Sequence, residues 1–329
     1  MKQGILGSLQ RSPKGRGWAG PFLIIGRQTK DRLARRSMKI LTVGIGLLVP
    51  VMALALLFRA APIFSSQPLV KLLFSSTWHP LQGAYGFLPF IMGTLWVTVV
   101  GMVIAVPPSI LTAIYLAEYA SPRLRALAKS LIDLLAGIPS VVYGVWGLLV
   151  LVPLIERVIA PTLDSILGFI PFFRAENPTG YGVLAGGFVL AVMVFPIIIA
   201  VTMEVFCAVP QGLREVCLSL GGTRWQTVRH VVLRRALPGV LAAVVLGFSR
   251  AFGETMAVLM VVGNVPQVPH SIFDAAYPLT ALIANNYGEM MSVPLYESAL
   301  MAAALILLVV VLIFNILSRI VLVRLSQAE

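Results

Sequence analysis

An arginine and a glutamate, Arg250 and Glu254, interrupt a long apolar run of the sequence. A charged side chain at the centre of a bilayer costs at least about 2.5 kcal/mol, so such residues usually face a protein interior or a water-filled path. A guanidinium can hold an oxyanion through two parallel hydrogen bonds, and a carboxylate can accept a hydrogen bond from a protonated oxygen. Side chains four residues apart share one face of a helix. We therefore expect Arg250 and Glu254, flanked by Ser249 and Thr255, to line an anion path; the alternative is an ion pair that only holds helices together.

A second candidate is the polar, basic segment 211–238, which lies between two apolar runs. Residues 211–220 are expected to form one short helix, which Gly221 and Gly222 would end. Thr223 is a suitable N-cap for a second helix over about 224–235. The apolar stripe of that second helix could pack on the protein itself or in the groove of a partner. The stripe consists of Trp225, Val228, Val231 and Val232.

The composition indicates which elements position these residues. Of the 329 residues, 58% are hydrophobic and only 12% are charged, and the mean hydropathy is +0.93. Soluble domains carry about a quarter charged residues, and a bilayer span needs about 20 apolar residues. The sequence therefore predicts an all-α integral membrane protein, a polytopic helical bundle. We expect six spans, at 39–60, 89–117, 128–152, 181–203, 239–262 and 297–322; seven or more would follow if Pro107-Pro108 divides the second.

The basic residues orient these spans. Most of the 25 Lys and Arg residues lie before the first span, between the second and third, in segment 211–238 or after the last span, whereas segment 263–296 contains none. By the positive-inside rule, both termini and segment 211–238 are cytoplasmic. Topology, with attraction to anionic lipid, accounts for the net charge of +12. No nucleic-acid partner is expected, because the charges are dispersed over short loops.

The predicted spans and their orientation divide the chain into parts. The polar lead is too long for a cleavable signal peptide, so the first apolar run is expected to be a retained anchor. The expected parts are a basic cytoplasmic extension 1–38, an anchor 39–60, an extracytoplasmic connection 61–88, a core 89–322 with a cytoplasmic loop 204–238, and a tail 323–329.

No catalytic or cofactor-binding motif is visible. None of the lysines follows a glycine, so the phosphate-cradling Gly-Lys-Ser/Thr loop of nucleotide hydrolases is missing. Cys207 and Cys217 have no histidine or carboxylate at metal-ligand spacing, and we interpret them as packing residues. The chain is therefore expected to be neither an enzyme nor a cofactor or metal protein. Any vectorial work must draw its energy from a partner or from an ion gradient.

Segment 211–238 resembles the "EAA" loop of permease subunits of bacterial ABC importers. The resemblance rests on Glu215-Val216-Cys217, Gly221 and Val231-x-Leu233 at the family spacing. It implies that Glu215, Gly221, Arg224 and Leu233 couple the chain to an ATPase subunit, in whose cleft this loop would sit. The sequence departs from the pattern in having Val216 and Cys217 after the glutamate, and Leu233-Arg234 in place of Leu-Pro.

The resemblance extends over residues 85–323, which look like permeases of phosphate ABC importers. It is carried by AIYLAEYASPRLR (113–125), LLAGIPSVVYGVWGL (134–148), FPIIIAVTMEVF (195–206) and SRAFGETMAVLMVVGN (249–264). It implies the ABC importer permease fold in the bacterial plasma (inner) membrane. The implied partners are a second permease subunit, a dimer of ATPase subunits and an extracytoplasmic phosphate-binding protein.

The ionisable pair agrees with such a substrate. At neutral pH inorganic phosphate keeps a proton and sulfate does not, so an arginine beside a hydrogen-bond acceptor favours phosphate. Three alternatives remain open: a permease for another oxyanion such as molybdate or sulfate, the sister phosphate permease, and a secondary transporter driven by an ion gradient. The last predicts uptake without any ATPase and often inverted repeats, of which the sequence shows no convincing example.

Overall fold

The computed structural model describes residues 21–175, 179–290 and 292–327, and the chain divides into two compact units, Met1–Leu54 and Ala55–Glu329. In this described part, six helices are long and apolar enough to cross a membrane, as the sequence predicts. They are Thr29–Ser66, Leu88–Tyr119, Ser140–Leu167, Val183–Ala208, Arg224–Phe252 and Tyr296–Ile320. Two of these differ from the expected windows in ways that matter for the site.

The first unit consists of most of one helix, α1 (Pro21–Ser66). None of its most apolar window is buried, and large side chains such as Ile40, Ile45 and Phe58 are exposed. A stretch of this length that is apolar all round is typical of a membrane span. The last turns of α1 belong to the second unit, where Ala60 and Ile63 are fully buried.

One end of the second unit carries a small aromatic core. Helix α2 (Leu69–Phe74) leads to a two-stranded antiparallel hairpin, β1 (Trp78–His79) and β2 (Ala84–Tyr85), with the 3-10 turn η1 (Pro80–Gln82) between them. Gly83 closes the turn at φ +71°, a conformation that glycine adopts without strain. The ring of Trp78 packs within 4.7 Å of that of Phe90, centroid to centroid. This core is continued by Tyr85, Phe87 and Tyr296.

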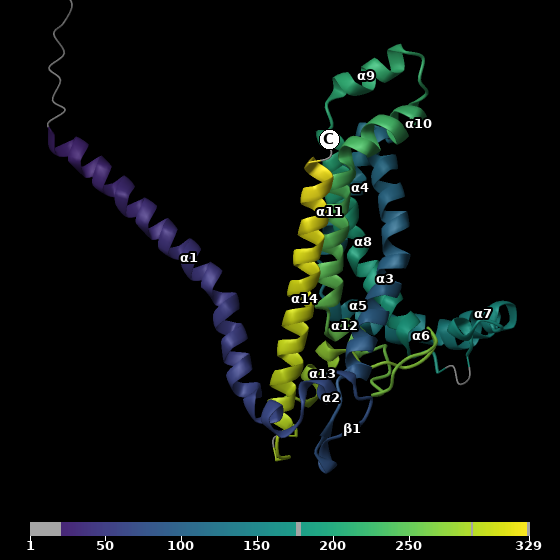
Figure 1. The fold of residues 1–329 in the computed structure, drawn as a ribbon. Coiled ribbons are helices and arrows are strands. Elements are labelled where there is room, and N and C mark those ends of the chain that lie inside the picture. Colours follow the sequence, from purple (N-terminus) through teal and green to yellow (C-terminus); the bar gives the residue numbers. More distant parts are fainter. Residues whose placement is uncertain (1–20, 176–178, 291, 328–329) are drawn as a thin grey trace, which may run out of the picture. The chain divides into compact units, whose positions relative to one another are not determined.

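Helices α3 (Leu88–Ile114) and α8 (Val183–Ala208) form the centre of the bundle (Figure 1). They approach closely at Gly101 and Gly187: a Cβ atom added to Gly101 would lie 3.0 Å from the Gly187 carbonyl oxygen. Small residues at such crossings let two backbones pack tightly. Pro107 and Pro108 are accommodated inside α3, which continues into the π-helical η2 (Tyr115–Tyr119), so the second span is not divided.

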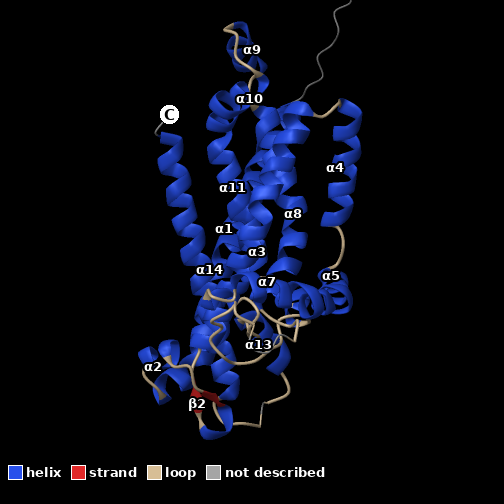
Figure 2. Cartoon of the chain, turned by 90° about the vertical axis from the view of Figure 1, so that its right-hand side faces the viewer, coloured by secondary structure: helices blue, strands red, loops and turns tan. Residues whose placement is uncertain are grey.

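The third expected span, 128–152, is wrong as a single helix. Helix α4 (Pro122–Ala136) ends at Gly137, and a new helical segment starts at α5 (Ser140–Trp146) (Figure 2). Pro139 has no N–H to donate and disfavours helical geometry in the residue before it, which explains the interruption. Short segments extend the helix to Leu167: η3 (Gly147–Leu151), α6 (Val152–Leu154), η4 (Ile155–Ile159) and α7 (Ala160–Leu167), followed by the 3-10 turn η5 (Pro171–Phe173).

The fifth expected span, 239–262, is also wrong in its limits. Helix α11 (Leu233–Phe252) ends at Gly253, and a separate short helix α12 (Met256–Leu259) follows. At its other end α11 is continuous with η6 (Val228–Val232) and α10 (Arg224–Thr227), in spite of Pro238. Helices α13 (Leu279–Asn286) and α14 (Tyr296–Gln327) complete the bundle, and α14 ends at the same end as α9 (Gln211–Ser219) and α10 (Figures 1 and 2).

Candidate functional site

Segment 211–238 forms the first short helix, the turn and the N-cap that the sequence predicts, but the second helix does not end near residue 235 and continues to Phe252. Helix α9 is followed by Gly221 at φ +83°, and Thr223 begins α10 with a reciprocal capping box. The Thr223 hydroxyl oxygen accepts from the Gln226 N–H at 3.2 Å, and the Gln226 carboxamide oxygen accepts from the Thr223 N–H at 2.8 Å. Figure 1 shows α9 and α10 at one end of the bundle, where α9 projects beyond the ends of the long helices.

The four predicted coupling residues lie in three different situations. Glu215 and Arg224 are exposed and line a common hollow of about 340 Å³. Gly221 provides the turn between α9 and α10. Leu233 is half-buried against the core at the start of α11, so its contacts are within the chain. The structure therefore brings Glu215 and Arg224 together and separates Leu233 from them.

The apolar stripe of α10 divides in the same way. Val228 and Val232 are buried in the core with 2% and 0% of their surface exposed, whereas Trp225 is 52% exposed. Packing on the bundle is thus confirmed for Val228 and Val232, whereas a partner's groove stays a prediction for the exposed Trp225.

Sequence reasoning missed a buried ion pair at this end of the bundle. Arg214 of α9 and Glu118 of η2 approach to 2.7 Å, with only 14% and 11% of their side chains exposed. The two residues are 96 positions apart, so no local pattern relates them. The sequence does mark each residue of the pair separately, because Arg214 and Glu118 are both ionisable residues next to apolar runs.

The second candidate site lies at the break between α11 and α12. Arg250 is in the last turn of α11 and is exposed, while Glu254 follows the helix end and is half-buried. The expectation that they share one helix face is wrong, because the helix stops at Phe252. The chain instead presents Glu254 on irregular backbone, which at membrane depth is tolerated where it lines a cavity or is buried in protein.

The Glu254 carboxylate and carbonyl both hold this break in place. One carboxylate oxygen accepts from the Ala257 N–H at 3.2 Å, and the Glu254 carbonyl accepts from the Thr280 hydroxyl at 3.0 Å. Thr94 and Thr98 of α3 line the same narrow cavity as Glu254. The break is therefore stabilised by a side chain from α13, 26 residues further along the chain.

Arg250 and Glu254 are not an ion pair in the structure. Among the described residues, the salt bridges join other groups, and no carboxylate pairs with Arg250. Ser249 donates to the Asn315 carboxamide oxygen of α14 at 3.2 Å, and Thr255 donates weakly to the Gly253 carbonyl at 3.4 Å. Among the residues that the structure describes, the alternative of an Arg250–Glu254 ion pair that only holds helices together thus has no counterpart.

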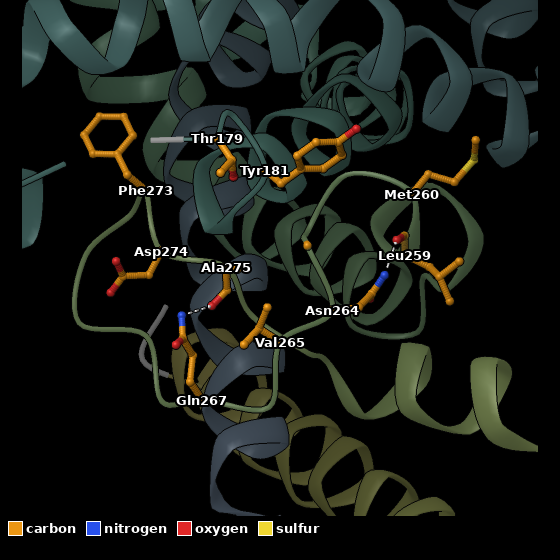
Figure 3. A pocket seen from close by; sticks show the side chains of 11 residues that line it. Thr179, Tyr181, Leu259, Met260, Asn264, Val265, Gln267, Phe273, Asp274 and Ala275 are labelled. Carbon is orange, nitrogen blue, oxygen red and sulfur yellow. Dashed lines mark hydrogen bonds between the residues drawn. The ribbon is translucent and has the colours of Figure 1, made fainter. Parts of the chain in front are cut away.

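A pocket of about 690 Å³ opens beyond the C-terminal end of α12 (Figure 3). Its polar lining is neutral apart from Asp274, whose carboxylate accepts from the His270 and Ser271 N–H groups at 2.8 and 2.9 Å. Asn264, at φ +54°, donates to the Leu259 carbonyl at 2.8 Å and leaves its buried carboxamide oxygen without a partner. Leu259 and Met260 connect this pocket to the α12 side of the break.

Three comparisons place the chain among known proteins. Residues 109–327 match the model of the family described as "Binding-protein-dependent transport system inner membrane component". The chain is 40% identical over 263 residues to the phosphate transport system permease protein PstC of Xylella fastidiosa strain 9a5c, covering 79% of this chain and 81% of that protein. It is 36% identical over 302 residues to PstC of Pasteurella multocida, covering 91% and 93%.

A solved structure agrees with the fold. A chain of a bacterial alginate ABC transporter, in complex with a pentasaccharide-bound periplasmic protein, superposes with a TM-score of 0.56, covering 89% of this chain and 94% of that chain. The sequence identity is 16%, so this likeness concerns the arrangement of helices alone.

Proposed function

This chain belongs to the family of binding-protein-dependent transport system inner membrane components, and from that premise we propose that it is the channel-forming permease subunit of an ATP-driven importer of inorganic phosphate. It is a non-catalytic, multi-pass component of the inner membrane. The observation that carries the phosphate assignment is 40% identity to a phosphate permease over four-fifths of both chains. The unpaired Arg250 beside the broken helix supports it.

We infer that these residue types would offer each part of a protonated oxyanion a partner. The exposed Arg250 guanidinium provides the positive charge and two parallel N–H donors. Glu254 provides a carboxylate that can accept a hydrogen bond from the protonated oxygen of hydrogen phosphate, and Ser249 and Thr255, adjacent to the pair in sequence, provide hydroxyl groups. Sulfate at neutral pH has no proton to donate and would be repelled by the carboxylate. The four residues therefore form a site that passes phosphate and rejects sulfate.

Membership of the family implies that the chain works within an ABC complex. We infer that its partners are a second permease subunit, an ATPase dimer and an extracytoplasmic phosphate-binding protein. Glu215, Arg224 and the exposed Trp225 form the surface on which an ATPase would dock, with Gly221 as the turn that presents them. Leu233 supports this surface from within the bundle. Closure of the ATPases would move α9 and α10 and switch the access to Arg250 and Glu254 from the outer to the inner side.

Uptake by vesicles containing the complete complex tests this function. We expect phosphate uptake that requires ATP and the ATPase subunits, with little competition from excess sulfate or molybdate. Competition by molybdate or sulfate as strong as by phosphate would assign another oxyanion. Uptake driven by an ion gradient without the ATPases would reveal a secondary transporter instead.

Glu254→Gln sharpens the test of selectivity. Removing the carboxylate charge should lessen the preference for phosphate over sulfate by about tenfold, equivalent to about 1.4 kcal/mol. Glu297→Gln is the matched control. Glu297 lies in the first turn of α14, where it pairs with Arg59 at 3.3 Å and its side chain is 48% exposed. An unchanged preference in Glu254→Gln would remove Glu254 from the selectivity site.

A further inference from the structure

Arg214 ties helix α9 to two other helix ends. Its Nη2 atom lies 2.7 Å from Glu118 Oε1, and its Nε atom lies 3.2 Å from each of the two carboxylate oxygens. The same guanidinium donates to the Phe206 carbonyl at 2.8 Å and to the Val209 carbonyl. These carbonyls belong to the end of α8, where helical carbonyls have no partner within the helix. One side chain of α9 therefore holds the ends of both η2 and α8.

A second arginine adds α4 to this group. Arg125 donates to the Leu116 carbonyl at 2.7 Å and to the Ala117 carbonyl, both at the end of the α3–η2 helix. We call Arg125, Arg214 and Glu118 the helix-end clamp. Through its three side chains, α3–η2, α4, α8 and α9 are joined at one place.

The position of Glu118 has no local explanation. A carboxylate in the last turn of a helix is disfavoured by the helix dipole, and a buried carboxylate is costly unless it is paired. Arg214 offsets both effects with two charge-assisted hydrogen bonds. A pair that serves only solubility or topology would not need to be buried.

Helix α10 is attached differently. It runs through η6 directly into α11, whereas α9 is joined to α10 by the turn at Gly221. The two helices of the loop thus differ in how they are attached. Helix α9 is joined to α8 by the two residues Val209-Pro210 and to α3–η2 by the helix-end clamp. Helix α10 runs on into η6 and α11, and Val228 and Val232 of η6 pack in the core of the bundle.

We propose that Glu118 and Arg214 are positioning residues that transmit displacement of α9 to α3 and α8 during transport. The proposal rests on the proposed function, since it takes α9 to be moved by an ATPase. Loosening the pair would let the ATPases close and hydrolyse ATP while α3 and α8 lag behind. The expected defect is therefore uncoupling, with fewer phosphate ions moved per ATP hydrolysed.

The test uses Glu118→Gln and Arg214→Lys in the complete complex, reconstituted with its ATPases and binding protein. Glu118→Gln removes the charge at nearly constant shape, and Arg214→Lys keeps the charge but loses the bidentate geometry. In both variants that assemble, we expect ATP hydrolysis stimulated by the binding protein to stay within about twofold, while phosphate per ATP falls about tenfold. A residue that matters only for folding would lower transport and hydrolysis in parallel and leave their ratio unchanged.

Glu204→Gln is the matched control. Glu204 of α8 forms an ion pair with Lys129 of α4 at 3.6 Å at the same end of the bundle, but the two side chains are 67% and 53% exposed. Removing the charge of Glu204 should leave the number of phosphate ions moved per ATP unchanged, because exposed ion pairs contribute little to the free energy of the fold. An unchanged ratio in both clamp variants, or an equal fall in Glu204→Gln, would overturn the proposal.

Amide hydrogen exchange of the assembled complex separates this proposal from the phosphate assignment. If the clamp holds α9 to η2, Glu118→Gln should speed exchange in both 211–219 and 115–119, by about tenfold, whatever anion is transported. Slow exchange in both segments of the variant would contradict the clamp even if phosphate uptake is established. Absence of phosphate uptake by the wild-type complex would contradict the function but not the clamp.

Discussion

Arg214 and Arg250 have the same side chain but differ in burial and in bonding partners. Arg214 is nearly buried, and its guanidinium is shared among a carboxylate and two backbone carbonyls. Arg250 is exposed beside a helix break, and no described carboxylate pairs with it. A guanidinium with each of its three nitrogen atoms engaged within the chain fixes structure, whereas one without such partners is available to a ligand. The comparison teaches that partners, more than residue type, separate the holding role from the binding role.

The largest effect is expected where the engaged arginine is removed. Arg214→Ala leaves Glu118 buried without a partner and frees two helix-end carbonyls. Breaking a buried ion pair costs about 3 to 5 kcal/mol. We expect a corresponding loss of stability of the isolated subunit in detergent, measured by thermal unfolding. A loss under about 1 kcal/mol would mean that water replaces Arg214 easily and that the clamp is weak.

Replacing the guanidinium of Arg250 should instead reduce transport and leave the stability of the subunit unchanged. Arg250→Lys keeps a positive charge but cannot hold an oxyanion bidentately. We expect phosphate uptake to fall about 10- to 100-fold, equivalent to about 1.4 to 2.7 kcal/mol, with unchanged assembly. Arg319→Lys, an exposed arginine of α14, serves as the control. Normal uptake by Arg250→Lys would erase the proposed difference between the two arginines.

A smaller effect is expected at the capping box. Thr223→Ala removes the acceptor for the Gln226 N–H and should destabilise the start of α10 by about 1 kcal/mol. Faster amide exchange across 224–227 would measure this loss. Exchange in α9 should not change, because α9 is held by Arg214. Equal acceleration in α9 would show that the two helices open together.

The smallest effect is expected at the exposed ion pair. Lys129→Gln should change the free energy of unfolding by less than about 0.5 kcal/mol, since the solvent screens this pair on both sides. Thermal unfolding of the same preparation as for Arg214→Ala gives the direct comparison. A larger loss would indicate that burial is a poor guide to the strength of ion pairs at this end of the bundle.

The parts of the fold that depend on local chemistry could be predicted from the sequence. Hydropathy predicted the number of spans, though not the limits of the third and fifth, and the Gly221–Thr223 pattern predicted the turn and the cap. The break at Gly253–Thr255 could not be predicted, because its stabilising group is the hydroxyl of Thr280 on another helix. Pro139 could be interpreted as a kink within one span or as an end between two helices, and only packing distinguishes these. The pairing of Arg214 with Glu118 depends on the fold, since nothing local relates the two.

The unbroken helix Arg224–Phe252 connects the two candidate sites mechanically. At about 1.5 Å per residue, its 29 residues form an arm about 43 Å long. Arg224 stands at one end of this arm and Arg250 near the other. A pivot of only about 5° around either end would sweep the opposite end through roughly 4 Å, comparable to the width of an anion. Angular displacement of this one helix could therefore open or close a passage at its far end.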